Sequence, residues 1–189
     1  MTPFKLLFPL ALASLLFSQP NSFTPPVTDT VVLVVRHAEK SGPSGDVPLS
    51  AAGEARAQAL AEVARQAGVQ AVITTQFQRT RQTAAPLASS LGIRPQVIEA
   101  RGPVPEHARE VAAAIRARHA GQTVLVVGHS NTVSAIVAAL GAPAFPDLCD
   151  EEYDHLYTVI VASEGSARLV RSRFGAPSTI TATCAAMAR

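Results

Sequence analysis

The stretch Val31-Val32-Leu33-Val34-Val35-Arg36-His37-Ala38-Glu39-Lys40 decides the fold of this chain. Its five consecutive Val and Leu residues show no polar alternation, which predicts a strand buried on both faces, as in a parallel sheet covered by helices. Ligands of such sheets bind at the carboxyl ends of the strands. Arg36 and His37 are therefore expected to stand in a crevice at the end of this strand.

A second stretch, Thr123-Val124-Leu125-Val126-Val127-Gly128-His129-Ser130-Asn131-Thr132, has the same form. Its apolar run also predicts a buried strand, with His129 at the carboxyl end. Two strands of one parallel sheet end at the same edge. The imidazoles of His37 and His129 are therefore expected in one pocket, although 92 positions separate them.

Length and charge restrict the class of protein. The 189 residues are most simply one domain with a sizeable core. The net charge of +2 is too small, and the arginines are too scattered, to indicate a nucleic-acid partner.

The amino terminus has the pattern of an export signal. Lys5 is followed by a mostly apolar segment, 6–17, and then by a stretch rich in Pro, Ser and Thr. The segment is shorter than the ~20 residues of a spanning helix. We expect residues 1–26 to be a signal peptide, or an amino-terminal anchor, with a linker, and residues 27–189 to be the domain. The protein would then be periplasmic or extracellular, with no membrane contact beyond that anchor if it is retained.

The only two cysteines, Cys149 and Cys184, permit a disulfide in an exported chain. Such a bridge would join the tail, 176–189, to the domain and stabilise it by roughly 3 to 4 kcal/mol. Two unpaired cysteines are the alternative.

Strands and helices are expected to alternate along the chain. Pro86 is expected to kink or restart the second helix. The expected strands are 30–35, 69–75, 94–100 and 123–128, the helices are 50–66, 78–91, 106–119 and 131–140, and a final hairpin is 156–162 with 167–174. This order predicts an α/β fold, a three-layer α/β/α sandwich whose sheet is mostly parallel and closes on a C-terminal hairpin.

The residues at the strand ends favour the binding of an anion. A guanidinium is a fork of donors suited to phosphate or carboxylate, and a neutral imidazole is a nucleophile or base near neutral pH. Arg36-His37 alone is weak evidence, since a strand-end arginine beside a surface histidine is common. The second strand adds Arg79 at the start of a helix, where the dipole favours an anion. Arg81, two positions along, should face elsewhere.

The segment after the fourth strand does not form a serine nucleophile elbow. That motif, Gly-x-Ser-x-Gly, would need glycine at position 132, where the chain has Thr132.

These motifs, taken together and in order, resemble the histidine phosphatase superfamily, the fold group of the phosphoglycerate mutases, in its smaller branch (branch 1). The resemblance covers about residues 30–174. It rests on Arg36-His37, on the segment 79–84, on Gly128-His129, and on Pro48-Leu-Ser-Ala-Ala-Gly53 before the first helix. The family's usual glycine after the first histidine is Ala38 here, a change that one methyl group should make tolerable.

The resemblance implies a phosphoglycerate mutase-like fold and a phosphoric monoester hydrolase that needs no metal or other cofactor. His37 would take the phosphoryl group as a phosphohistidine, and Arg36, Arg79 and His129 would bind its oxygens. Glu106 would be the proton donor, with Glu99 and Glu110 as rivals. Support of its own helix amino terminus is the alternative role of Glu106. Lys40, Ser130 and Asn131 are candidates for the rim that touches a small phosphorylated substrate.

Other readings stay open. The chain is alternatively a protein phosphohistidine phosphatase or a non-catalytic phosphate-binding module, whereas a mutase is disfavoured because no insertion is present to hold a diphosphorylated intermediate. His107, His119 and His155 lack metal-ligand spacing and are expected to be ordinary. The acidic stretch 147–154 is expected to be solvated surface rather than a cation site, and Tyr153 and Asp154 are further candidates for the pocket rim. The identity of the substrate and the oligomeric state do not follow from the sequence.

Overall fold

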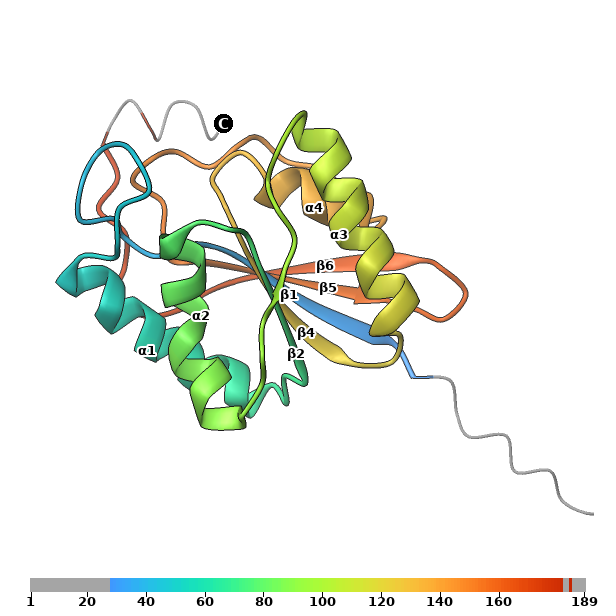
Figure 1. Ribbon diagram of the computed structural model, residues 1–189. Coiled ribbons are helices and arrows are strands. Elements are labelled where there is room, and N and C mark those ends of the chain that lie inside the picture. Colours follow the sequence, from blue (N-terminus) through green and yellow to red (C-terminus); the bar gives the residue numbers. More distant parts are fainter. Residues whose placement is uncertain (1–27, 182–183, 185–189) are drawn as a thin grey trace, which may run out of the picture.

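The computed structural model describes residues 28–181 and Cys184, and the segment in which an export signal is expected lies outside them. The described part has six strands and four helices (Figure 1). They are β1 Thr30–Arg36, α1 Ala51–Gln66, β2 Ala71–Thr74, α2 Gln78–Leu91, β3 Gln96–Val97, α3 Val104–Arg118, β4 Thr123–Gly128, α4 Val133–Ala139, β5 His155–Val161 and β6 Ala167–Arg173. Among these helices, none combines the length and the apolar character that crossing a bilayer requires.

The strands form one sheet in the order β3-β2-β4-β1-β5-β6. The first four run parallel to one another, and β5 and β6 are antiparallel additions at one side. Helices α1 and α2 cover one face and α3 and α4 the other (Figure 1). The predicted three-layer sandwich, its mostly parallel sheet and its final hairpin are confirmed.

The unbroken apolar run of β1 follows from this layering. Val32 and Val34 face the core under α3 and α4, and Leu33 and Val35 face the core under α1 and α2. All four side chains are at most 3% exposed. Burial of each one stabilises the fold by roughly 1.5 to 3 kcal/mol, so neither face of this strand tolerates a polar residue.

The pairing of β1 with β4 aligns the two chemical motifs. Val35 lies opposite Val127 and Arg36 opposite Gly128. The ladder continues one step further, because the N–H of His37 donates to the carbonyl of Gly128 over 2.9 Å. His37 and His129 therefore leave the same edge of the sheet as neighbours.

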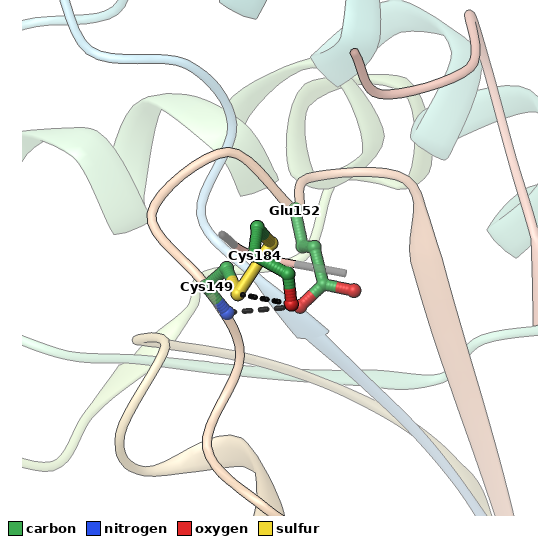
Figure 2. Close-up of side chains that lie close together, drawn as sticks. All are labelled: Cys149, Glu152 and Cys184. Carbon is green, nitrogen blue, oxygen red and sulfur yellow. Dashed lines mark hydrogen bonds between the residues drawn. A yellow bond between two sulfur atoms is a disulfide. The ribbon is translucent and has the colours of Figure 1, made fainter. Parts of the chain in front are cut away.

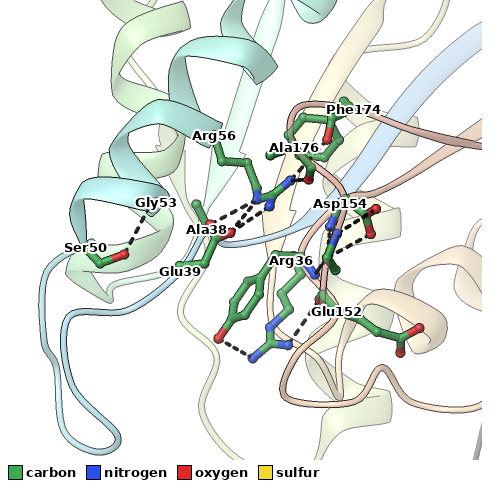
Figure 3. Close-up of polar contacts among 12 residues, drawn as sticks. Arg36, Ala38, Glu39, Ser50, Gly53, Arg56, Glu152, Asp154, Phe174 and Ala176 are labelled. Atoms are coloured by element: carbon green, nitrogen blue, oxygen red, sulfur yellow. Dashed lines mark hydrogen bonds and ion pairs between the residues drawn. The ribbon is translucent and has the colours of Figure 1, made fainter. Parts of the chain in front are cut away.

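The loop after β1 is fixed to the start of α1. Ser50 caps the helix by accepting a hydrogen bond from the N–H of Gly53 over 3.1 Å (Figure 3), as the sequence predicts. Gly53 also has to be glycine, since a Cβ there would lie 2.3 Å from the carbonyl oxygen of Glu39. The turn that follows His37 thus depends on a close backbone contact.

Several element boundaries differ from the prediction, and three of the differences are clear. The strand expected at 94–100 is only β3, Gln96–Val97, because beyond it the N–H groups of Ile98 and Ala100 bond to Thr74 and to the Gln76 side chain instead of a full strand. Helix α3 begins at Val104, two residues early, and α4 spans only Val133–Ala139.

The expected break at Pro86 is wrong. Helix α2 runs through Pro86 without interruption. Its buried face continues on both sides of the proline, with Thr83 and Ala84 before it and Leu87 and Ala88 after it. This packing outweighs the hydrogen bond that the proline removes.

Candidate active site

A cavity of about 420 Å³ opens at the carboxyl ends of the parallel strands. Residues that follow β1, β2 and β4 line it together with the first turn of α3. They are Arg36, His37, Lys40, Phe77, Arg79, Ala100, Gly102, Val104, His107, His129, Ser130, Asn131, Thr132 and Asp150. The cavity is thus at the place where the sequence predicts a ligand to bind.

The two histidines predicted to converge lie against each other. Their ring centroids are 5.4 Å apart, and the ring planes are inclined by 65°. Both residues are buried, with 4% of His37 and 8% of His129 exposed. The expectation that both imidazoles share one pocket is confirmed.

The hydrogen bonds of His37 leave one ring nitrogen free for chemistry. Nδ1 lies 2.8 Å from the carbonyl oxygen of Ala38, which can only accept, so Nδ1 carries the proton and Nε2 the lone pair. Burial lowers the pKa of His37 to about 3, against the effect of that hydrogen bond and with the help of the nearby Arg36. The ring is therefore neutral near pH 7, as a nucleophile must be.

The His129 ring is held by a threonine on the neighbouring strand. Its Nε2 lies 3.1 Å from the hydroxyl oxygen of Thr75, which follows β2. Its main-chain N–H donates to the hydroxyl of Thr132 over 2.8 Å. Burial, followed by the positive charge of Arg79, lowers the pKa of His129 to about 3. A phosphoryl anion nearby would favour the protonated form of this ring.

Arg36 is tied to the loop between α4 and β5. Its Nη1 donates to the carbonyl of Glu152 over 3.2 Å (Figure 3) and to that of Cys149 over 2.7 Å. Its Nη2 donates to the Tyr153 hydroxyl over 3.3 Å and lies 3.5 Å from Asp150. The Tyr153 ring also lies under the guanidinium, 4.1 Å from Cζ. Burial lowers the pKa of Arg36, an effect that Tyr153 and Asp150 oppose.

Arg79 enters the cavity from the first turn of α2. Its guanidinium lies over the Phe77 ring at 4.3 Å and donates to the carbonyl of Gly45 over 3.3 Å. Asp46 lies 3.9 Å away. Burial lowers the pKa of Arg79, and Asp46 partly offsets this.

The two arginines share an unusual feature. The Nε atoms of Arg36 and Arg79 are both buried without a hydrogen-bond partner. An unpaired buried N–H on a cation is costly, and an oxyanion in the cavity would remove that cost. This pair of donors is the clearest sign in the geometry that the cavity is suited to an anion.

The three predicted rim residues also border the cavity. Lys40, Ser130 and Asn131 line it. The ammonium of Lys40 donates to the carbonyl of Pro43 over 3.0 Å, which holds it near the mouth.

Glu106, in contrast, is not brought to the cavity. Its side chain is exposed, and it is absent from the residues that line the pocket, whereas its neighbour His107 lines it and is 4% exposed. Sequence reasoning did not place His107 at the site, and the structure shows it in the wall of the cavity. A helical period already indicated this, because His107 shares the apolar face of α3 with Val111 and Ile115, and Glu106 does not.

Two residues of the acidic stretch lie at the site, namely Tyr153, which the sequence analysis offered for the pocket rim, and Asp150, which it did not. Asp150 lines the cavity and faces Arg36, and the Tyr153 ring lies 6.2 Å from the His37 ring. The Asp150 side chain is nevertheless 91% exposed, so the stretch is solvated surface that also borders the cavity. No local pattern indicates it, because the loop is placed by contacts with distant parts of the chain.

The predicted disulfide between Cys149 and Cys184 is present, with the Cα atoms 5.7 Å apart. Glu152 lies beside it and accepts a hydrogen bond from the N–H of Cys149 over 2.8 Å (Figure 2). Within the described residues these three side chains form a cluster whose ligand atoms lie within 4.8 Å of one another. The two sulfur atoms are bonded to each other, so neither is a free thiolate for a metal.

Comparisons with known proteins agree with this geometry. Residues 32–101 match the model of the histidine phosphatase superfamily (branch 1). No curated protein matches the chain in sequence.

Several solved structures share the fold. A mycobacterial glucosyl-3-phosphoglycerate phosphatase superposes with a TM-score of 0.62 at 16% identity, over 79% of this chain and 100% of that one. The complex of that phosphatase with VO3 superposes with a TM-score of 0.59 at 17% identity, over 74% of this chain and 96% of that one. The protein histidine phosphatase SixA, complexed with tungstate, superposes with a TM-score of 0.58 at 19% identity, over 76% of this chain and 96% of that one. Residues 32–101 of the chain are thus similar to the histidine phosphatase superfamily (branch 1), and the fold of the described part is the one these solved phosphatases share.

Proposed function

We propose that this protein is an exported, metal-independent phosphatase that hydrolyses a phosphomonoester through a phosphohistidine on His37. The observation that carries the proposal is the facing pair His37 and His129 in a cavity where the Nε atoms of Arg36 and Arg79 are buried and unpaired. Phosphoryl transfer needs positioning and neutralisation of charge above all. This cavity offers both without a metal ion.

In the first step, Nε2 of His37 attacks phosphorus. The N–P bond forms as the bond from phosphorus to the ester oxygen breaks. Arg36, Arg79 and His129 hold the three phosphoryl oxygens. The proton stays on Nδ1 of His37, which donates to the Ala38 carbonyl, and this keeps the lone pair of Nε2 directed at the substrate. The leaving oxygen takes a proton and departs as an alcohol.

In the second step, water attacks the phosphohistidine. The N–P bond breaks, Nε2 regains its lone pair and inorganic phosphate leaves. Two displacements at phosphorus restore its original configuration, so the reaction proceeds with retention.

The relatives give independent support. Solved structures with the same fold include a glucosyl-3-phosphoglycerate phosphatase, also as a complex with inorganic phosphate, and a protein histidine phosphatase. The last of these favours a second candidate for this chain, a protein phosphohistidine phosphatase, since the position of Glu106 outside the cavity removes the expected acid for a poor leaving group.

Export is the other part of the proposal. The charged and apolar start of the chain supports it, and so does the disulfide between Cys149 and Cys184, because such bridges persist in oxidising compartments. Expression of the full chain, cell fractionation and amino-terminal sequencing of the product test it. A full-length product in the cytosol would contradict export.

Release of phosphate from p-nitrophenyl phosphate, with and without a chelator, tests the activity. We expect turnover that is unchanged by the chelator and absent in His37→Ala, with His119→Ala as the control, since His119 lies outside the cavity. Acid quenching should trap a phosphorylated wild-type protein and none in His37→Ala. Binding of phosphate without any turnover would instead support a non-catalytic module. Hydrolysis of phosphohistidine peptides alone would support the second candidate.

A further inference from the structure

A third buried histidine belongs to the candidate site. His107, in the first turn of α3, lines the same cavity as His37 and His129 and is only 4% exposed. Its buried Nδ1 has no partner of full hydrogen-bond geometry, although the ring also interacts with the Glu99 carbonyl. A buried ring nitrogen without a partner is costly, so its retention in a cavity calls for a functional explanation.

The cavity has few other groups that can transfer a proton to a leaving oxygen. Glu106 is exposed and does not line it. The ammonium of Lys40 donates to Pro43 near the mouth. Asp150 lines the cavity, but its side chain is 91% exposed and faces Arg36. His107 is the one buried proton carrier among these residues.

We propose that His107 is a catalytic residue that protonates the leaving oxygen and afterwards takes a proton from the attacking water. The inference rests on the proposed phosphatase function and gives it the acid and base that Glu106 does not supply.

The proton balance closes over one turnover. In the first step the ester oxygen takes a proton from protonated His107 as the P–O bond breaks, which yields the alcohol and a neutral His107. In the second step water attacks phosphorus, its proton passes to His107 and the N–P bond breaks. The sum is ester plus water giving alcohol plus phosphate, with His107 returned to its protonated form.

The electrostatics of the cavity allow this cycle. In the free site burial lowers the pKa of His107, against the effects of the Glu99 carbonyl and of Glu110, so the ring is neutral near pH 7. His129 is the other ionisable ring that interacts with it. A bound phosphoryl group brings negative charge close to the ring and favours its protonated form. His107 thus takes up its proton when the substrate binds.

The dependence of rate on leaving group tests the inference. Phenyl phosphate releases phenol, whose pKa is about 10, whereas 2,4-dinitrophenyl phosphate releases a far stronger acid that needs no proton. We expect His107→Gln to slow the hydrolysis of phenyl phosphate by roughly 10²-fold or more. The same variant should slow the hydrolysis of 2,4-dinitrophenyl phosphate by less than about 5-fold, because only the phenol leaving group needs the acid. His119→Gln, on the same chain segment but outside the cavity, should change neither rate.

Two further measurements distinguish a loss of catalysis from a loss of folding. Melting temperatures of His107→Gln and His107→Asn show whether each variant folds, and added imidazole should restore phenyl phosphate turnover in His107→Ala. In the wild type, the rate should depend only weakly on the leaving group. A steep dependence in the wild type, equal slowing of both substrates by His107→Gln, or the same selective loss in Asp150→Asn would each overturn the proposal. If the wild type hydrolyses neither ester, the proposed function itself has failed.

Discussion

The Nη1 atom of Arg36 lies 2.7 Å from the carbonyl oxygen of Cys149. The guanidinium that faces the cavity is therefore bonded directly to one half of a disulfide. The partner, Cys184, lies 35 residues further along the chain. The bridge thus bears on the position of Arg36 as well as on the attachment of the C-terminal segment.

Cys184→Ser is expected to weaken both stability and activity. Loss of a bridge that closes a 35-residue loop should lower the free energy of unfolding by about 3 to 4 kcal/mol in the chain-entropy model. The loop at 149–153 should also loosen its hold on Arg36, and we expect kcat/KM to fall by roughly 10-fold, the loss of about one charge-assisted hydrogen bond. Urea unfolding and p-nitrophenyl phosphate kinetics measure the two effects.

Reduction of the disulfide in the wild-type protein is the matched control for Cys184→Ser. Dithiothreitol should lower wild-type activity to that of Cys184→Ser and leave a Cys149→Ser, Cys184→Ser double variant unchanged. A reduced wild-type protein with full activity would show that the bridge does not position Arg36.

Arg79→Lys is expected to lower affinity for the phosphoryl group. Lysine keeps the positive charge, but it lacks the Nε–H that is buried and unpaired in Arg79. A hydrogen bond to a charged group contributes about 1.5 to 3 kcal/mol, so kcat/KM should fall by roughly 10- to 100-fold and inhibition by inorganic phosphate should weaken in parallel. Arg81→Lys is the control, because Arg81 is exposed on the same helix and does not line the cavity. Similar losses in both variants would refute the role of Arg79.

As the pH falls, the ligand-free protein is expected to lose stability already at pH values well above those at which carboxylates titrate. Burial lowers the pKa values of His37 and His129 to about 3 in the folded state, against about 6.5 in the unfolded chain. The unfolded state therefore binds more protons below pH 6.5. The stabilisation is complete above that pH and is lost as the pH falls, by up to about 1.4 kcal/mol per pH unit for each ring.

Urea unfolding between pH 7 and pH 5 measures this slope. His37→Gln removes one of the two rings and should reduce the slope by about one proton. Saturating inorganic phosphate should also reduce it, because a bound anion favours the protonated rings. A slope that His37→Gln leaves unchanged would show that this ring is not held neutral by the fold.

The sequence predicts the parts of the site that depend on buried strands. Arg36, His37 and His129 follow apolar runs that can only be central strands, so their convergence follows from sheet geometry. Asp150 and Tyr153 are different, because their loop is placed by Arg36 and by the distant Cys184, and no local pattern encodes such contacts.

Glu106 and His107 are an intermediate case, because the sequence contains part of the information that places them. The family resemblance favoured the Glu106 carboxylate as the acid, because a resemblance points to a residue type and not to the direction in which a side chain lies. The period of α3 carries the missing information, because buried His107, Val111 and Ile115 recur every three to four residues. A helical phase read together with the motif would have placed His107, and not Glu106, on the buried face of α3.

Gly53→Ala is expected to damage the site from a distance. The added methyl would lie 2.3 Å from the carbonyl oxygen of Glu39 and 3.0 Å from its nitrogen, and the backbone there is held by the bond from Ser50 N–H to the Glu39 carbonyl. Neither side can yield without moving the turn that follows His37, so we expect a loss of about 1 to 3 kcal/mol in stability, as for overpacking, together with a lower kcat. Gly42→Ala is the matched control, because its methyl would meet only the Val47 side chain at 3.6 Å. The melting temperature and the rate of p-nitrophenyl phosphate hydrolysis of both variants test this prediction. A Gly53→Ala protein as stable and active as Gly42→Ala would show that this contact does not fix the turn that follows His37.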